Sequence, residues 1–178
     1  MAASSTFDNA NNVNAGEHMQ TFFRTILIGA ALAVGAAAVA SAAGATNPVV
    51  GTWTLNLEKS KFTPGPAPKS QTRTYAQTDQ GTTLTVTGVA ADGSSISQQA
   101  TFKYDGKDYP ISGSADYDTL ALKKVNGSTV KSTLKLGGKV VGSATRTISA
   151  HGKVLTLKIK ATNAKGVPYE AVAVFDKQ

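Results

Sequence analysis

Few side chains in this sequence have the chemistry of a catalytic site. The chain contains no cysteine, which excludes thiol nucleophiles and cysteine-bound metals. One of its two histidines lies near the N-terminus, and the other, His151, precedes Gly152 in an expected turn. A histidine base needs a nucleophile and an orienting partner, and no serine or aspartate motif points to His151. We therefore expect no enzyme, with an uncharacterised cavity enzyme as the alternative.

Four acidic residues lie close together in the sequence, at Asp105, Asp108, Asp116 and Asp118. Such a group has the chemistry to bind Ca²⁺ or to act as an acid/base pair. Calcium loops, however, space their oxygen ligands more tightly and add a bidentate acid. The pair Asp105-Gly106 is also an ordinary turn sequence. A single histidine without cysteine does not make a zinc site either, so we expect no metal and no cofactor.

From Val49 onward, apolar and polar side chains alternate in short runs. Leu155, Leu157 and Ile159, for example, share one face of their run. Turn sequences with glycine separate the runs, and this pattern is typical of antiparallel strands. No stretch has a sustained helical period. The expected strands are 49–57, 71–78, 82–90, 94–104, 107–112, 117–125, 128–136, 139–149, 153–162 and 168–176.

All but one of the connections between these runs are short, which favours an up-and-down meander over a Greek key. We predict an all-β fold in which the antiparallel up-and-down meander closes into a barrel of about 8–10 strands. The long connection is 58–70, which contains three prolines at alternating positions. Since proline disrupts regular pairing, we expect this segment to be a loop. The polar outward faces differ from the apolar outer band of an outer-membrane barrel.

The N-terminal part of the chain has the features of an export signal. Arg24 provides a positive charge, 26–39 is an uncharged apolar run, and Ala40-Ser41-Ala42 supplies the small residues that signal peptidase accepts. The apolar run is shorter than the roughly 20 residues that span a bilayer. We expect secretion to the periplasm or the extracellular space, with no stable membrane insertion after cleavage.

These features divide the chain into four parts. Residues 1–18 are a disordered or misassigned N-terminal extension, 19–42 are the signal peptide, 43–48 are a short linker, and 49–178 form a single β-barrel domain. The chain carries 18 lysines and arginines against 11 acids, a net charge of +7. These cations are spread singly along the expected strands, as on solvated faces. Nucleic-acid binders usually concentrate them, so we expect no nucleic-acid partner.

The motif Gly51-Thr52-Trp53 resembles the Gly-x-Trp signature of lipocalins and related calycin barrels. The longer stretch GTWTLNLEKSKFTPGPAPKS, with the later YDGKDYP element at 104–110, resembles a group of small secreted bacterial proteins of unestablished activity. The resemblance implies a fold and a compartment but no reaction. It also implies that Trp53 closes the barrel floor against a late-strand arginine, Arg146, with Arg73 as the other choice. The disulfides common in lipocalins and the two-helix lid of fatty-acid-binding relatives are missing.

Apart from its large apolar residues, the inward face consists mostly of small residues, which leaves volume inside the barrel unfilled. Pockets with apolar walls and a few polar groups suit amphipathic molecules. We therefore expect a monomer that binds a small apolar or amphipathic ligand inside the barrel. The alternative is a non-catalytic envelope interaction module with a solid core, in which the tyrosines only reach solvent. The candidate ligand-binding residues are Tyr75, Gln98, Phe102, Tyr104, Arg146 and Tyr169.

Overall fold

The structure, a computed structural model, describes residues 47–178. The extension at 1–18, the signal peptide at 19–42 and most of the linker lie outside the described residues. The ten strands are β1 (Gly51–Thr63), β2 (Ser70–Thr78), β3 (Gly81–Val89), β4 (Ser95–Phe102), β5 (Asp105–Ser112), β6 (Thr119–Lys124), β7 (Thr129–Leu136), β8 (Lys139–Ile148), β9 (Val154–Thr162) and β10 (Pro168–Lys177).

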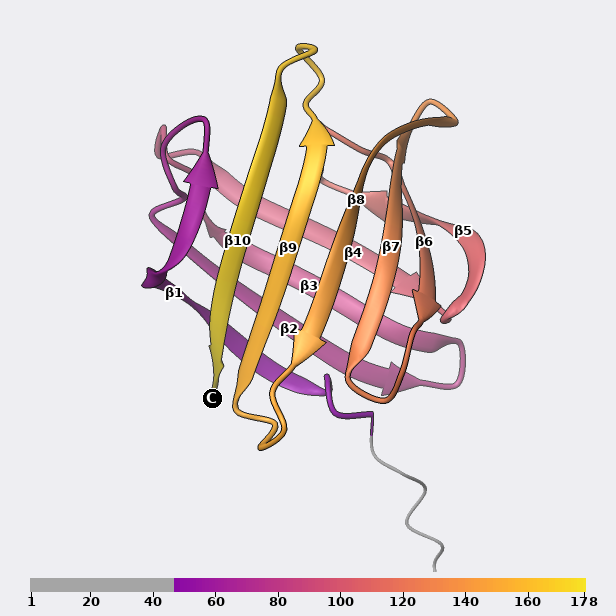
Figure 1. Cartoon of the computed structure of the whole chain (residues 1–178). Coiled ribbons are helices and arrows are strands. Elements are labelled where there is room, and N and C mark those ends of the chain that lie inside the picture. The colour runs from indigo at the N-terminus through magenta and orange to yellow at the C-terminus, as the bar shows by residue number, and fades with distance from the viewer. Residues whose placement is uncertain (1–46) are drawn as a thin grey trace, which may run out of the picture. The chain divides into compact units, whose positions relative to one another are not determined.

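Each strand pairs antiparallel with the strands before and after it in the sequence. β1 pairs with both β2 and β10, so the meander closes into a barrel (Figure 1). The predicted all-β, up-and-down barrel is confirmed, at the upper end of the expected strand number. No helix within residues 47–178 is long and apolar enough to cross a membrane.

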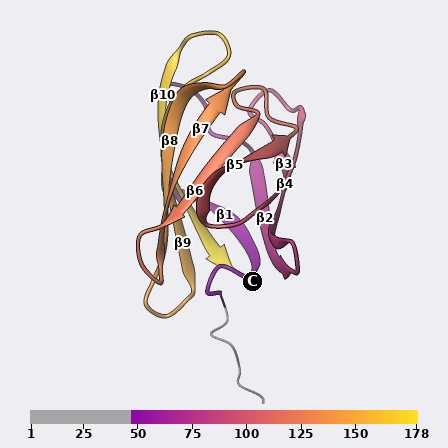
Figure 2. The same ribbon diagram turned by 90° about the vertical axis from the view of Figure 1, so that its right-hand side faces the viewer.

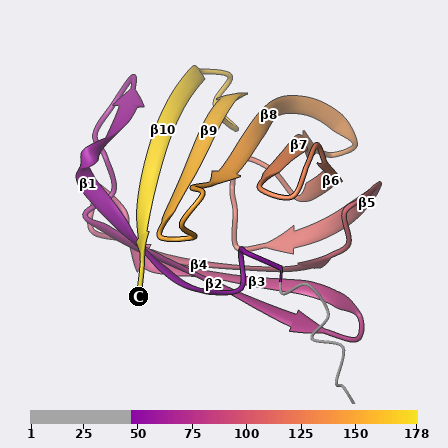
Figure 3. The same ribbon diagram turned by 60° about the horizontal axis from the view of Figure 1, so that its bottom comes forward.

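The barrel is flattened, so two groups of strands face each other. Figure 2 shows β6 to β10 along one side and β1 to β4 along the other, and Figure 3 shows the ring from below. The inward side chains fill the space between the two groups. The largest that are fully enclosed include Trp53, Phe102, Phe175 and Leu155. The period-two alternation of the sequence thus places one face of every strand in a common core.

The expectation that 58–70 is a loop is wrong for its first part, because β1 continues to Thr63. The strand accommodates extra residues through a bulge against β10. Asn56 pairs with Val174, and the next pair along the strand is Lys61 with Val172. The proline-containing connection therefore shortens to residues 64–69, and the prolines follow the strand rather than preventing it.

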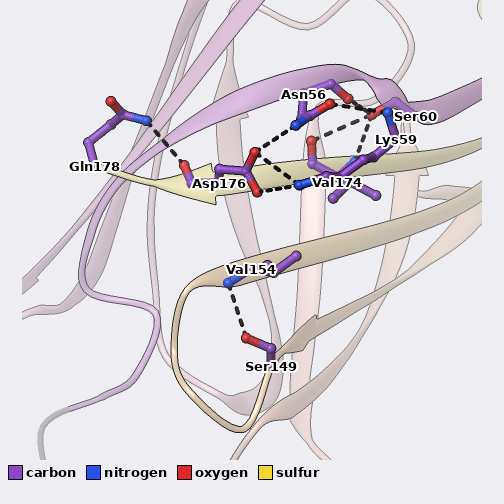
Figure 4. Close-up of polar contacts among 8 residues, drawn as sticks. All are labelled: Asn56, Lys59, Ser60, Ser149, Val154, Val174, Asp176 and Gln178. Carbon is purple, nitrogen blue, oxygen red and sulfur yellow. Dashed lines mark hydrogen bonds and ion pairs between the residues drawn. The ribbon is translucent and has the colours of Figure 1, made fainter.

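The bulge is held by side chains that replace the missing backbone contacts (Figure 4). The Ser60 hydroxyl donates to the carbonyl oxygen of Asn56 at 2.6 Å and accepts from the backbone N–H of Val174 at 2.9 Å. The Asn56 amide donates to the Asp176 carboxylate at 2.7 Å, and the Lys59 ammonium lies 3.4 Å from the same carboxylate. One serine hydroxyl thus bridges the two strands where the ladder is interrupted.

Replacing Ser60 with alanine is expected to destabilise the barrel by about 1–3 kcal/mol, because the N–H of Val174 loses its acceptor at a partly buried position. The free energy of unfolding in urea measures this cost. Ser97→Ala removes an exposed hydroxyl from β4 and serves as the matched control. Equal stability of the two variants would contradict the bridging role of Ser60.

Candidate functional site

A partly open cavity lies inside the barrel between the two groups of strands. The space that the centre of a water molecule can occupy in this cavity is about 50 Å³. This is enough for a few water molecules. Apolar side chains, among them Leu84, Leu134 and Leu157, form most of its wall. The polar residues at the wall are Arg73, Tyr75, Tyr117, Ser132 and Arg146. Two arginines in an apolar interior are the unusual feature of this cavity.

Arg146 comes from β8 and is only 6% exposed. One of its terminal nitrogens, Nη2, donates to the hydroxyl of Tyr104 at 3.1 Å. The guanidinium also lies over two rings, 5.2 Å from the centre of Tyr75 and 5.4 Å from that of Tyr104. Its Nε–H is buried and has no hydrogen-bond partner among the described residues. A buried donor without an acceptor is costly, so this group is available to a ligand.

Arg73 comes from β2 and is partly buried. Its Nε donates to the hydroxyl of Tyr75 at 3.3 Å, and Nη1 donates to the Gln71 side-chain oxygen at 3.2 Å. The guanidinium lies 5.6 Å from the ring centre of Phe175. Within residues 47–178 no carboxylate forms an ion pair with Arg73 or Arg146. Both positive charges are therefore balanced only by neutral oxygens and aromatic rings.

The arginines also determine how the interior tyrosines titrate. Burial alone would raise the pKa of Tyr75, but the charges of Arg73 and Arg146 outweigh burial and lower it below its usual value. Burial raises the pKa of Tyr117, although Arg73 acts in the opposite direction. The interior thus favours negative charge at Tyr75, between the two arginines, and disfavours it at Tyr117.

Strand geometry explains how these groups meet. Arg73 and Tyr75 are two residues apart on β2, so both side chains point inward. Arg146 on β8 alternates with outward-facing residues in the same way, between the buried Ala144 and Ile148. β2 and β8 belong to opposite sides of the flattened barrel (Figure 2), so the two arginines reach the cavity from facing walls.

The structure separates the six predicted ligand-binding residues into two groups. Tyr75, Phe102 and Arg146 line the interior cavity, and Tyr104 contacts it indirectly through its hydrogen bond to Arg146. Gln98 and Tyr169 are not among the residues that line it.

Gln98 is half-buried on β4. Tyr169 lies at the start of β10 and lines two open hollows beside the connection at Pro64. Burial raises the pKa of Tyr169. These two residues therefore do not belong with the arginine pair.

Of the polar residues at the cavity wall, Arg73, Tyr117 and Ser132 were not among the predicted ligand-binding residues. The signal for Arg73 is present in the sequence, since an inward Tyr75 requires an inward Arg73 two residues earlier. Tyr117 lies in the connection before β6, although the expected strand 117–125 included it. Alternation from the inward Leu120 and Leu122 would have placed it on the outward face. Its place at the cavity wall depends on how this connection folds.

Trp53 is fully buried at the end of the barrel where the described chain begins, and its indole N–H donates to the carbonyl oxygen of Val49 at 2.7 Å. For the expected floor contact, the structure places Arg73 directly opposite Trp53 in the β1–β2 register. The cation over the Trp53 ring is that of Lys177, at 5.1 Å from the ring centre. Arg146 instead stacks on the cavity tyrosines.

The four clustered aspartates each have a separate local partner. Asp105 accepts from the N–H of Lys107, and Asp108 pairs with Lys135. Asp116 accepts from the N–H of Ala164, and Asp118 accepts from that of Gly137. Within residues 47–178, no three acidic or histidine side chains converge as a metal site would require.

No protein-family model matches the sequence, and no curated protein is significantly similar to it. Among solved structures, the zebrafish ileal bile acid-binding protein in complex with cholic acid is similar at 13% identity. The match covers 74% of this chain and 99% of that chain, with a TM-score of 0.42. At this identity nothing about its ligand transfers. The chain's own strand order makes it a closed, ten-stranded, up-and-down barrel.

Proposed function

We propose that this protein binds a compact molecule with an apolar body and one anionic group inside the barrel. The observation that carries the proposal is the buried Nε–H of Arg146, which has no hydrogen-bond partner within residues 47–178 and lies at an apolar cavity that Arg73 also lines. An anion placed between the two guanidiniums accepts hydrogen bonds from both. The Leu and Ile side chains of the wall contact the rest of the ligand.

The cost of burying the Arg146 charge without a paired anion supports this assignment. Removing an ionised group from water costs several kcal/mol unless it is paired and hydrogen-bonded. Within the described residues, Arg146 has one hydrogen bond, to a neutral phenol, and no ion pair. A ligand carboxylate or sulfonate supplies the missing countercharge, and hydrogen bonds between ionised groups are roughly twice as strong as neutral ones. A neutral apolar molecule supplies neither this countercharge nor these hydrogen bonds.

The size of the cavity limits the ligand. Pockets for drug-sized molecules enclose about 300–1,000 Å³, whereas this interior offers about 50 Å³ to the centre of a water-sized sphere. A short alkyl or single-ring carboxylate therefore fits better than a long-chain fatty acid or a sterol. Each added methylene is worth about 0.8 kcal/mol until the cavity is full, after which affinity stops rising.

The direct test is calorimetric titration of the purified protein with hexanoate and with hexanol. Hexanoate is expected to bind saturably and hexanol much more weakly, because only the carboxylate reaches both arginines. Extending the series to dodecanoate should show affinity rising and then levelling off. Saturable binding of hexanol as tight as that of hexanoate, or no binding by any member of the series, would sink the proposal.

Tyr75 makes anion binding depend on pH. Its pKa is lowered, so as pH rises Tyr75 becomes a phenolate before an ordinary tyrosine does. The phenolate then neutralises arginine charge that the ligand needs. Hexanoate affinity is therefore expected to be highest below the pKa of Tyr75 and to fall as pH rises through it. Tyr75→Phe should remove this alkaline fall, while a fall that persists in Tyr75→Phe would assign it to another group.

For the place of action, the proposal retains export by the segment Met19–Ala42. The positive charge, the apolar run and the small residues that support it are features of the sequence. Expression of the full chain in a bacterial host, with N-terminal sequencing of the product outside the cytoplasm, tests it. A start near Ala43 is the expected result, and retention of the uncleaved chain in the cytoplasm would contradict it.

A further inference from the structure

The strands β6, β7, β8 and β9 form a part of the wall that has no acidic residue of its own. From Thr119 to Tyr169 the sequence contains nine lysines and one arginine but no aspartate or glutamate. These four strands are consecutive neighbours in the barrel (Figure 1). The outer surface of this wall is therefore positively charged, and acids reach it only from adjacent strands.

The strand register places three of these lysines in one row across the wall. Lys123 on β6 lies opposite Lys131 on β7, which lies opposite Thr145 on β8, and Thr145 lies opposite Lys158 on β9. All three lysines are exposed. Since neighbouring strands are about 4.8 Å apart, the row crosses the wall at right angles to the strands. Spacing along the sequence alone makes the same lysines look scattered.

Within residues 47–178 no lysine of this row forms an ion pair, although Asp105 of β5 lies opposite Lys123 in the register. The ion pairs near it use other lysines, Lys135 with Asp108 and Lys160 with Glu170. Like charges directly opposite each other on neighbouring strands are destabilising, so the pair Lys123 and Lys131 costs stability. An anionic partner that spans the row would offset this cost.

An open groove of about 540 Å³ runs over β6, β7 and β8, and its lining also includes Gly106 of β5 but not Lys158 of β9. Lys123 and Lys131 line it together with the hydroxyl-bearing residues Thr133, Ser143 and Thr145. Ammonium groups bind carboxylates or sulfates, and hydroxyls exchange hydrogen bonds with other hydroxyls. The groove thus offers binding partners for both kinds of group on an acidic sugar chain, its negatively charged groups and its hydroxyls.

We propose that this outer groove, continued by Lys158 on the adjacent β9, binds a linear acidic polysaccharide, with Lys123, Lys131 and Lys158 contacting successive negative groups along the chain. No aromatic residue lines the groove, whereas single-stranded nucleic acid is bound by stacking its bases on aromatic rings. None of the exposed large apolar residues of the described barrel lines it either, and a membrane surface is bound partly through such residues. The proposal is independent of the interior anion site.

The test measures binding of polygalacturonate to the purified protein by calorimetry at low and at physiological salt. The triple variant Lys123→Gln, Lys131→Gln, Lys158→Gln is expected to lose at least tenfold in affinity. The matched control is Lys61→Gln, Lys69→Gln, Lys165→Gln, which removes the same charge from exposed lysines outside the groove. It should stay within about threefold of the unmodified protein, because general attraction falls off over a Debye length of about 10 Å.

Equal losses in the two triple variants would overturn the proposal in favour of general charge attraction. Absence of polygalacturonate binding by the unmodified protein would also overturn it. Oligothymidylate and vesicles of phosphatidylglycerol provide two further arms. If either binds through the row more tightly than polygalacturonate does, the occupant is a nucleic acid or a membrane and the proposal is wrong. Hexanoate binding should be the same in all variants, which separates this test from that of the interior site.

Discussion

Arg146→Met is expected to stabilise the barrel by about 1–4 kcal/mol and at the same time to weaken the binding of hexanoate by roughly thirtyfold or more. Replacing a buried ion pair by apolar side chains of similar volume is often neutral or stabilising by this amount, and within the described residues Arg146 has no ion-pair partner that the replacement would leave behind. Arg146 is suited to this outcome because its Nε–H is buried and has no partner in the part of the chain that the structure describes. Methionine keeps the packing between the rings of Tyr75 and Tyr104.

The loss of binding has the opposite origin. The ligand anion in the variant is desolvated in an apolar cavity with one of its two guanidiniums missing. Truncating one partner of such a buried charged pair costs about 2–5 kcal/mol, so affinity should fall by roughly thirtyfold or more. Urea unfolding and calorimetric titration with hexanoate measure the two effects.

Lys153→Met makes the same change of charge at an exposed position and is the matched control. It should leave both stability and hexanoate affinity nearly unchanged. If the Arg146 variant is less stable and still binds hexanoate, this arginine is a structural residue. Its contacts within the barrel then already offset the cost of burying its charge. A gain in stability with a loss of binding, by contrast, identifies a residue retained for its ligand.

Trp53→Ala is expected to destabilise the barrel by about 3–5 kcal/mol, the usual cost of emptying a buried aromatic site. Trp53 is fully enclosed, and its indole N–H satisfies the carbonyl oxygen of the equally buried Val49. Small domains have only about 5–15 kcal/mol of stability in total. The change therefore removes a large share of it, which urea unfolding followed by circular dichroism measures.

Trp53→Phe separates packing from hydrogen bonding at the same site. It keeps a ring at the floor but leaves the Val49 carbonyl without its donor, at an expected cost of about 1–3 kcal/mol. Leu57→Ala, at a side chain that is 44% exposed, is the control and should cost less than either change. A barrel that tolerates Trp53→Ala as well as it tolerates Leu57→Ala would contradict the role of Trp53 in closing the floor.

The strands and their order follow from the sequence because alternation and glycine turns are local signals. The continuation of β1 to Thr63 does not, since it depends on Ser60 contacting Val174, which is far away in the chain. A pattern of prolines indicates where regular pairing stops but not how a side chain prolongs it through a bulge.

The candidate site is predictable only in part for a similar reason. Alternation implies that Arg73 points inward with Tyr75, and the late-strand position of Arg146 places it in the barrel wall. That Arg146 lies between Tyr75 and Tyr104 is a matter of side-chain contact across the barrel. The row formed by Lys123, Lys131 and Lys158 likewise requires the register of four strands, which the charge pattern along the chain does not contain.

The most direct test of the interior anion site is nuclear magnetic resonance of the arginine side chains. Only Arg73 and Arg146 occur in residues 47–178, so one arginine variant assigns both Nε–Hε signals. Hexanoate is expected to shift the Arg146 signal saturably, as its Nε–H gains an acceptor, while hexanol leaves it in place. An Arg146 signal that does not move with hexanoate, or that moves equally with hexanol, would contradict the assignment of this cavity as an anion site.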